Sequence, residues 1–391
     1  MISQRVLFLN HIAQTSPNPI GLEIVFAEGD FLFDNTGKKF VDLISGISVS
    51  NVGHRHPKII KAIHEQLEKY MHLMVYGEYI QSPQVKLAEK IASLLPQNLN
   101  STYFTNSGSE SIEGALKLAK RITGRSELIS FENGYHGSSH GALSIMGNEF
   151  FKTSFRPLLP GTRILKYNNF EDLKLITTST ACVVVEPVQG EAGAICPTNG
   201  FLEALRSQCD QTGTLLIVDE IQTGFGRTGK LFGFQHSSIV PDIIVFAKGL
   251  GGGLPIGAFV SSKENMQTLC ENPVLGHLTT FGGNAVCCAA ALATIEIILT
   301  ENLIDGIAER EKIILEHLKH PEIKSLRGKG LLYAMELENE EKVKDVIQKS
   351  LSKGVITDWF LFCDKALRIA PPLNINKTVL KESCDVIVSC L

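Results

Sequence analysis

The middle of the chain alternates short apolar runs with amphipathic segments, from about residue 100 to residue 260. The segment 109–122, for example, repeats apolar residues at the three- and four-residue spacing of a helix, and Gly124 follows as a stop signal. Strands that alternate with helices are typical of a parallel sheet covered on both faces. We expect strands at residues 102–105, 128–131, 181–185, 214–218, 243–246 and 257–260.

The two ends of the chain have a different pattern. Residues 23–27, 31–33 and 39–41 indicate a short hairpin, and helical spacing begins near Pro57. After a long apolar helix at about 285–299, helices mix with short strands at 330–336 and 367–369. We therefore predict an α/β fold with a large domain over residues 50–280 and a smaller α+β domain over residues 281–391. The N-terminal segment, residues 1–49, is expected to join the small domain through its hairpin.

Composition narrows the possible environments and partners. Apolar residues make up 44% and charged residues 20%, as in ordinary globular proteins. A net charge of −4 without a run of basic residues argues against nucleic acid as a partner. The nine cysteines are scattered and lack the paired Cys/His spacing of a metal site, which favours a reducing cytoplasm and no metal. We see neither a secretion signal nor an apolar stretch of membrane-spanning length, so we expect no membrane partner.

Two charged residues follow expected buried strands directly. Asp219 ends the run 215–218, and Lys248 comes after 243–247 and before a glycine-rich loop. Ligands of doubly wound sheets bind at the carboxyl ends of the strands. An ordinary ion pair would explain both residues. The sharper hypothesis is that both face one aromatic aldehyde cofactor, where a desolvated lysine attacks the aldehyde and a carboxylate keeps a ring nitrogen protonated.

A phosphate-binding segment is expected nearby. Residues 106–110 join the strand 102–105 to a helix, and Ser107, Gly108 and Ser109 offer backbone N–H groups and hydroxyls at its N-terminus. A serine at a helix start is usually only an N-cap, so this segment alone is weak evidence for a phosphate site. At the next strand end, Tyr135 follows a glycine turn and is suited to stack on a flat ring or to be a half-buried tyrosine.

Longer motifs around these residues resemble the class III aminotransferases, the family of ornithine, acetylornithine and other ω-amino transaminases. Residues 216–229, 241–243 and 247–257 match the family signature, including the gap between Asp219 and Lys248. Similar strings occur at 34–42, 53–57, 106–113, 186–191, 279–284 and 368–372, so that the resemblance covers nearly the whole chain.

This resemblance implies pyridoxal 5'-phosphate (PLP) as cofactor and the PLP-dependent transferase fold type I. It further implies that Lys248 carries PLP as a Schiff base and acts as general base, and that Asp219 pairs with the ring nitrogen. Thr280 would reach the phosphate bound by a neighbouring subunit, which implies a homodimer with shared active sites. The other cofactor-binding residues implied are Ser107, Gly108, Ser109, Tyr135, His136, Glu186 and Gln222.

The resemblance also assigns two residues to the substrate. Arg368 matches the arginine that grips the α-carboxylate of an amino or keto acid, and Glu191 matches the carboxylate that pairs with this arginine when an ω-amine is bound. A surface salt bridge is the alternative for this pair. At Ser138 the chain departs from the ornithine, acetylornithine and 4-aminobutyrate transaminases, which carry an arginine there for the substrate's remote carboxylate.

The predicted function is transfer of an amino group, in the first place the ω-amino group of an acetylornithine- or ornithine-like donor, to an α-keto acid such as 2-oxoglutarate or pyruvate by a ping-pong mechanism. An aminomutase resembling glutamate-1-semialdehyde aminomutase is the alternative, and the need for a separate keto acceptor discriminates between them. A fold that binds PLP or a protein partner without turnover is disfavoured by the presence of Lys248, Asp219 and Gln222.

Overall fold

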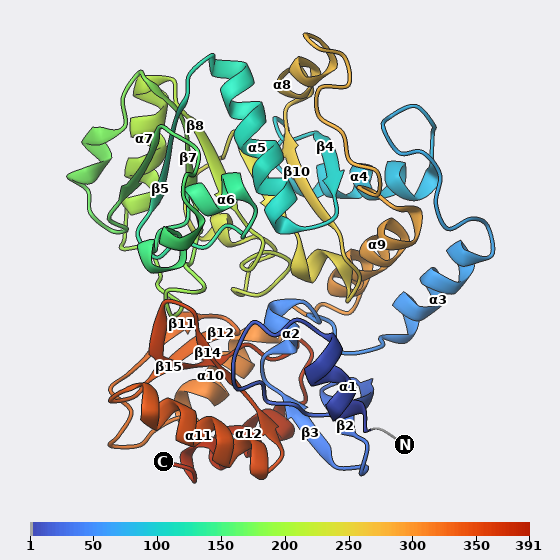
Figure 1. Ribbon diagram of the computed structural model, residues 1–391, viewed down its shortest axis with the longest axis vertical. Helices are drawn as coiled ribbons and strands as arrows, with labels where there is room; N and C mark the ends of the chain where they lie inside the picture. The colour runs from blue at the N-terminus through green and yellow to red at the C-terminus, as the bar shows by residue number, and fades with distance from the viewer. Residues whose placement is uncertain (1–2) are drawn as a thin grey trace.

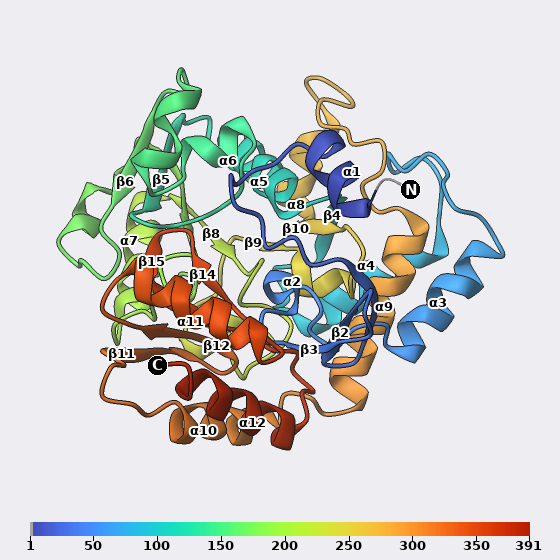
Figure 2. The same ribbon diagram turned by 60° about the horizontal axis from the view of Figure 1, so that its bottom comes forward.

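A computed structural model describes residues 3–391 of the chain. A large part built on one sheet lies above a smaller part in Figure 1, and the N-terminal segment and the C-terminal helices lie together in the smaller part. Figure 2 shows the same division from a second direction, with α2 (Ser45–Ser48) between the two parts in both views.

The large part contains a seven-stranded sheet in the order β4-β10-β9-β8-β7-β5-β6. Strand β10 runs antiparallel to both of its neighbours, and the remaining pairs are parallel. The strands are β4 (Ser101–Thr105), β5 (Glu127–Phe131), β6 (Thr162–Leu165), β7 (Thr180–Val185), β8 (Leu215–Asp219), β9 (Ile243–Phe246) and β10 (Gly257–Ser261).

Both faces of this sheet are buried, because successive strand residues point to opposite sides and both sets are apolar. On β9, Ile243 and Val245 belong to the apolar cluster around α5 (Gly108–Thr123), whereas Ile244 and Phe246 belong to the cluster on the opposite face. That second cluster includes buried residues of α3 (Pro57–Leu67), α4 (Ser82–Leu94), α7 (Phe201–Thr212) and α9 (Ala285–Thr300). Short helices α6 (His140–Ser144) and α8 (Lys263–Gln267) complete the large part.

The smaller part contains two four-stranded sheets. The C-terminal sheet has the order β11-β12-β15-β14, and the N-terminal hairpin forms a second sheet, β1-β2-β3-β13, in which β3 pairs in parallel with β13 from the C-terminal region. The elements are α1 (Gln4–His11), β1 (Ile24–Glu28), β2 (Phe31–Asp34), β3 (Lys39–Asp42), α10 (Ile307–His317), β11 (Ser325–Lys329), β12 (Leu332–Glu336), α11 (Glu340–Ser352), β13 (Val355–Ile356), β14 (Asp358–Phe360), β15 (Cys363–Ile369) and α12 (Lys377–Val388).

The predicted fold class, a mostly parallel α/β sheet with smaller α+β elements, is confirmed. Each of the six strands expected in the large sheet lies within one residue of its expected bounds, whereas the edge strand β6 was missed. The domain boundaries at 49 and 280 stay a prediction. Helix α9, which the prediction assigned to residues 281–391, contributes buried residues to the core of the large sheet. The helices of residues 3–391 are all too short or too polar to span a lipid bilayer.

Candidate active site

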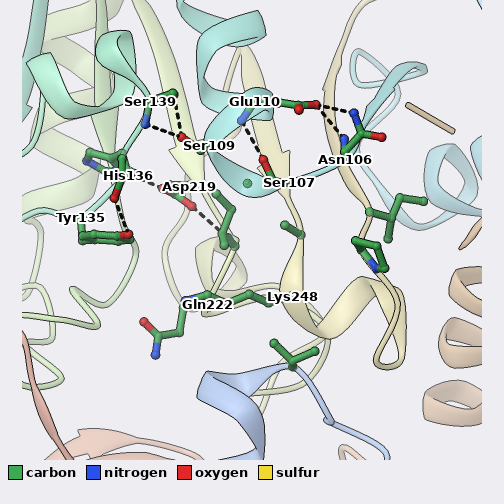
Figure 3. A pocket seen from close by; sticks show the side chains of 18 of the residues that line it. Asn106, Ser107, Ser109, Glu110, Tyr135, His136, Ser139, Asp219, Gln222 and Lys248 are labelled. Carbon is green, nitrogen blue, oxygen red and sulfur yellow. Dashed lines mark hydrogen bonds and ion pairs between the residues drawn. The ribbon is translucent and has the colours of Figure 1, made fainter. Parts of the chain in front are cut away.

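A cavity of about 790 Å³ opens at the carboxyl ends of the parallel strands. Figure 3 shows Ser107 and Ser109 at the start of α5, with Asp219 below them and Lys248 and Gln222 further down. Every cofactor-binding residue predicted from the sequence lines this cavity except Thr280. The lining residues are Val49, Asn106, Ser107, Gly108, Ser109, Glu110, Tyr135, His136, Gly137, Ser138, Ser139, Glu186, Asp219, Ile221, Gln222, Ala247, Lys248, Gly253, Leu254, Pro255 and Ile256.

Lys248 follows strand β9 by two residues and lies in a left-handed backbone conformation, with φ of 45°. A non-glycine residue pays conformational free energy there, so the surrounding structure must hold it in place. Burial lowers the pKa of its amine, against the opposing charges of Glu191, Asp219 and Glu186. Lys248 lines the cavity, so a ligand bound there would meet this residue.

Asp219 ends strand β8 and is almost fully buried, at 2% exposed. Its Oδ2 lies 2.7 Å from His136 Nδ1, and its Oδ1 accepts a hydrogen bond from the Ile221 backbone N–H at 2.9 Å. Burial alone would lower the pKa of His136, but the hydrogen bond to Asp219 and the charges of Asp219 and Glu186 outweigh burial and raise it. The histidine therefore supports a negative charge on Asp219 at the end of the strand.

Glu186 follows strand β7 and is buried beside this pair. Its two oxygens accept hydrogen bonds from the backbone N–H groups of Tyr135, at 3.0 Å, and Gly190, at 2.9 Å. Burial raises its pKa to about 7. Through these hydrogen bonds Glu186 connects the loop that carries Tyr135 to the loop after β7.

The start of α5 forms a shaped polar corner of the cavity. Ser107 caps the helix by accepting a hydrogen bond from the Glu110 backbone N–H, while Ser109 Oγ lies 2.6 Å from Ser139 Oγ and accepts from the Ser139 backbone N–H at 3.1 Å. Gly137 has φ of 123°, and a Cβ there would approach Ser109 Oγ to 2.4 Å. Only glycine fits beside Ser109, which keeps this corner open next to the free N–H groups at the start of α5.

Tyr135 and Gln222 lie on other walls. The Tyr135 hydroxyl is 3.2 Å from Ser138 Oγ, and its ring centroid is 6.2 Å from that of Phe362. Gln222 is buried at 6% exposed, and within residues 3–391 its Nε2 has no hydrogen-bond partner. A buried amide donor without a partner costs free energy, so this group is suited to a ligand acceptor.

Arg368 and Glu191 form a buried pair outside the cavity lining. The guanidinium meets the carboxylate in a bidentate arrangement, with NH1 to Oε1 at 3.0 Å and NH2 to Oε2 at 2.8 Å. Both side chains are nearly inaccessible, at 2% and 4% exposed. Asp358 lies 3.1 Å from Arg368 Nε, and the Phe360 ring lies 4.5 Å from the guanidinium carbon. The two charges act in opposite directions on the Lys248 amine, since Glu191 raises its pKa and Arg368 lowers it. A surface salt bridge, the alternative interpretation, is wrong.

Thr280 is exposed and does not line the cavity. It follows Thr279, whose hydroxyl accepts a hydrogen bond from Asn106 Nδ2 at 2.9 Å. Sequence reasoning missed Ser139, Val49 and Asp358 at or near the site. Ser139 stands beside the Tyr135 turn and was within reach of the motif argument, whereas no local pattern marks Val49 or Asp358.

Comparison with known proteins identifies the family of this chain. A family model described as aminotransferase class-III matches residues 12–391. The chain is 38% identical to the acetylornithine aminotransferase of Methanopyrus kandleri over 384 residues, which are 97% of this chain and 96% of the relative. Two solved structures share the fold. The ornithine aminotransferase of Toxoplasma gondii has a TM-score of 0.92 and 28% identity, with 98% of this chain and 92% of that chain covered. A PLP-bound amine transaminase from an uncultivated Pseudomonas species has a TM-score of 0.88 and 26% identity, with 98% and 96% covered. The chain therefore belongs to the class III aminotransferases, the PLP-dependent transaminases.

Proposed function

We propose that this transaminase takes the ω-amino group of an acetylornithine- or ornithine-like donor and transfers it to an α-keto acid such as 2-oxoglutarate or pyruvate by a ping-pong mechanism. The observation that carries the proposal is the buried Arg368–Glu191 pair near Lys248, because a paired guanidinium can meet either a neutral or an anionic substrate group. The relative from Methanopyrus kandleri, named an acetylornithine aminotransferase, supports the choice of donor.

The described residues fit PLP. The corner formed by Gly108, Ser109 and Gly137 suits a phosphate, since glycine leaves room and the helix N-terminus attracts an anion. The carboxylate of Asp219 suits a protonated pyridine nitrogen, and the free amide of Gln222 suits the ring oxygen. Lys248 supplies the amine for the aldehyde, and Tyr135 a ring for stacking.

Bound PLP supplies an electron sink for the pair of electrons released when the substrate's C–H bond breaks. Asp219 would keep the pyridine nitrogen of the bound cofactor protonated, and His136 would support the aspartate charge through the hydrogen bond of 2.7 Å. The Lys248 amine, whose pKa is lowered by burial, would act as the general base that takes the proton from the substrate's C–H bond.

Arg368 and Glu191 would allow the site to accept two kinds of substrate, one with Arg368 paired to Glu191 and one with Arg368 unpaired. With Glu191 in place, the guanidinium is neutralised and an uncharged part of an ω-amine donor can lie beside it. When an α-keto acid binds, its carboxylate takes the bidentate position and Glu191 moves away. Ser138, bonded to Tyr135, offers a hydroxyl to the donor's remote end, where related enzymes have an arginine.

We also propose a homodimer with shared active sites. Two neighbouring segments expose large apolar side chains, among them Met71 and Ile80 at 67% and 95%, and Val274 and Phe281 at 71% and 58%. They lie side by side, since Asn284 Nδ2 donates to Met71 O at 3.0 Å. Thr280 belongs to the second segment, so a partner that covers these side chains would also cover Thr280, which the family resemblance assigns to the neighbouring subunit's phosphate. All nine cysteines are free, which supports a cytoplasmic location.

The test is a titration of the holoenzyme with single donors in the absence of acceptor. Acetylornithine or ornithine should bleach the visible absorption of the bound cofactor, and 2-oxoglutarate or pyruvate should restore it. Bleaching by α-amino acids alone would overturn the ω-donor proposal. Turnover of an amino aldehyde to an isomer without keto acid would identify an aminomutase instead.

A further inference from the structure

A short turn beside the cavity has an unusual backbone. In α2 (Ser45–Ser48), all four residues have positive φ, including Ser45 at 43°, Ile47 at 62° and Ser48 at 62°. The left-handed conformation is costly for residues with a Cβ, and most costly for a β-branched side chain such as isoleucine. Ser48 is also buried at 1% exposed, and among residues 3–391 its hydroxyl has no hydrogen-bond partner. Such a turn persists only where the surrounding structure holds it.

The turn leads directly into the cavity wall. Val49, the next residue, lines the cavity, and its backbone N–H donates to Ser45 O at 2.8 Å. In Figure 3 this turn lies below Lys248, on the opposite side from the start of α5. Val49 therefore follows this turn directly and lines the same cavity as Lys248.

A fully buried arginine holds both ends of this segment. Arg227 is 0% exposed, and its NH2 donates to Ser45 Oγ at 3.2 Å and to Asn51 Oδ1 at 2.6 Å. Its NH1 donates to two backbone carbonyls of the C-terminal sheet region, Leu331 O at 2.9 Å and Pro371 O at 2.5 Å. All four acceptors are uncharged, and burial lowers the pKa of Arg227 to about 9. A guanidinium buried without a direct carboxylate partner is expensive, which indicates a specific role.

The acceptors are themselves fixed in direction. Ser45 Oγ donates its proton to Ala370 O at 2.7 Å, and Asn51 Nδ2 donates to Phe225 O at 3.2 Å, so both oxygens that face Arg227 can only accept. Asn51 also packs against the residue after Lys248, because a Cβ at Gly249 would lie 2.4 Å from Asn51 Nδ2. Arg227 thus connects the turn, the C-terminal sheet and the Lys248 loop through one planar group.

We propose that Arg227 is a positioning residue that holds the left-handed turn 45–48 and thereby sets Val49 as a specificity-determining wall of the amino-donor site. Lysine cannot replace it, because a single ammonium has three donors and cannot serve acceptors on three segments in fixed directions. This role rests on the proposed function, in which the donor occupies the cavity beside Lys248. Amide hydrogen exchange tests the turn itself and needs no substrate.

The perturbing variant is Arg227→Lys, which keeps the charge. We expect the KM for the amino donor to rise roughly tenfold to a hundredfold, as for a wall displaced by about 1 Å, while kcat and the Kd for PLP change by less than about threefold. Amide hydrogen exchange of residues 43–52 in the holoenzyme should accelerate, while strands β8 and β9 keep their protection.

A suppressor distinguishes positioning from general damage. Ser48→Gly lowers the cost of the left-handed turn and removes the unpaired hydroxyl, whereas Ser48→Ala removes only the hydroxyl. In the Arg227→Lys background, Ser48→Gly should recover about fivefold or more of the lost KM and slow the exchange of residues 43–52, and Ser48→Ala should not.

The outcomes separate clearly. Equal rescue by both Ser48 variants, or exchange that accelerates equally in β8 and β9, would overturn the proposal. Should Arg227→Lys fail to fold, Val49→Ala tests the wall alone and must change the preference among donors without changing PLP affinity. Accelerated exchange of residues 43–52 with an unchanged donor KM would refute the role in specificity without touching the proposed transamination.

Discussion

Replacing Arg368 by glutamine should separate recognition of keto acids from the chemistry at Lys248. The guanidinium makes two charge-assisted hydrogen bonds to Glu191, at 3.0 and 2.8 Å, and would make the same two to an α-carboxylate. Losing such a buried bidentate contact costs about 2–4 kcal/mol. At about 1.4 kcal/mol for each factor of ten, kcat/KM for 2-oxoglutarate should fall roughly thirtyfold to several hundredfold. An aldehyde acceptor without a carboxylate should lose far less.

The same substitution makes a prediction about stability and pH. Burial alone would raise the pKa of Glu191, but the charge and hydrogen bonds of Arg368 outweigh burial and lower it below 4.5. A carboxylate with a lowered pKa stabilises the fold above its unfolded pKa, and this contribution is lost as the pH falls through the folded pKa. In Arg368→Gln, only the charge of Lys248 and the Leu361 backbone N–H still oppose burial of Glu191. The variant should therefore be about 3–5 kcal/mol less stable at neutral pH, with a smaller deficit toward pH 4.5 as Glu191 protonates.

The assays are steady-state kinetics with both acceptors and thermal unfolding of the holoenzyme between pH 4.5 and 8. Glu191→Gln is the matched control, because it removes the carboxylate paired with the two terminal nitrogens of Arg368 and keeps the guanidinium. It should spare keto acids and slow the ω-amine half-reaction. Equal losses for the keto acid and the aldehyde, or a Tm deficit that does not change with pH, would refute the reasoning about this pair.

Other predictions concern the cofactor and the donor. Gly137→Ala places a Cβ 2.4 Å from Ser109 Oγ, at a residue with φ of 123°. The Kd for PLP should therefore rise by a factor that corresponds to about 1–3 kcal/mol. Unchanged PLP affinity in equilibrium dialysis would argue against the phosphate corner. Ser138→Arg should lower the KM for donors with a remote carboxylate and raise the KM for neutral ω-amines. Ser138→Ala is the control for loss of the Tyr135 contact. KM values that change in the same direction for both donor classes would contradict the proposed position of the donor. Lys248→Ala should bind PLP only noncovalently and lose turnover, whereas residual transamination in single-turnover experiments would exclude Lys248 as the general base.

Much of the site followed from the sequence because strand ends in a parallel sheet converge on one edge. Asp219 and Lys248 each follow a run of apolar residues too short for a helix, so their place at the cavity could be predicted without coordinates. Strand β6 could not, since Thr162–Leu165 is an edge strand that mixes exposed and buried positions and carries little apolar signal.

The supports of the site were harder to predict. Arg227 stands in a glycine-rich loop and looks like a surface arginine, yet its acceptors come from residues far away in the chain. The left-handed turn at Ser45–Ser48 contradicts the local preferences of serine and isoleucine, because tertiary hydrogen bonds override them. Helix α9 is apolar on every side, so its sequence shows that it is buried but not against which sheet.

The central claim is that the Lys248 amine and the Asp219 carboxylate approach one cofactor from two strand ends. Reducing the holoenzyme with borohydride fixes PLP to the lysine that carries it, and peptide mapping by mass spectrometry locates the label. We expect the phosphopyridoxyl group on Lys248 alone. Stoichiometric label on any other lysine would contradict the account.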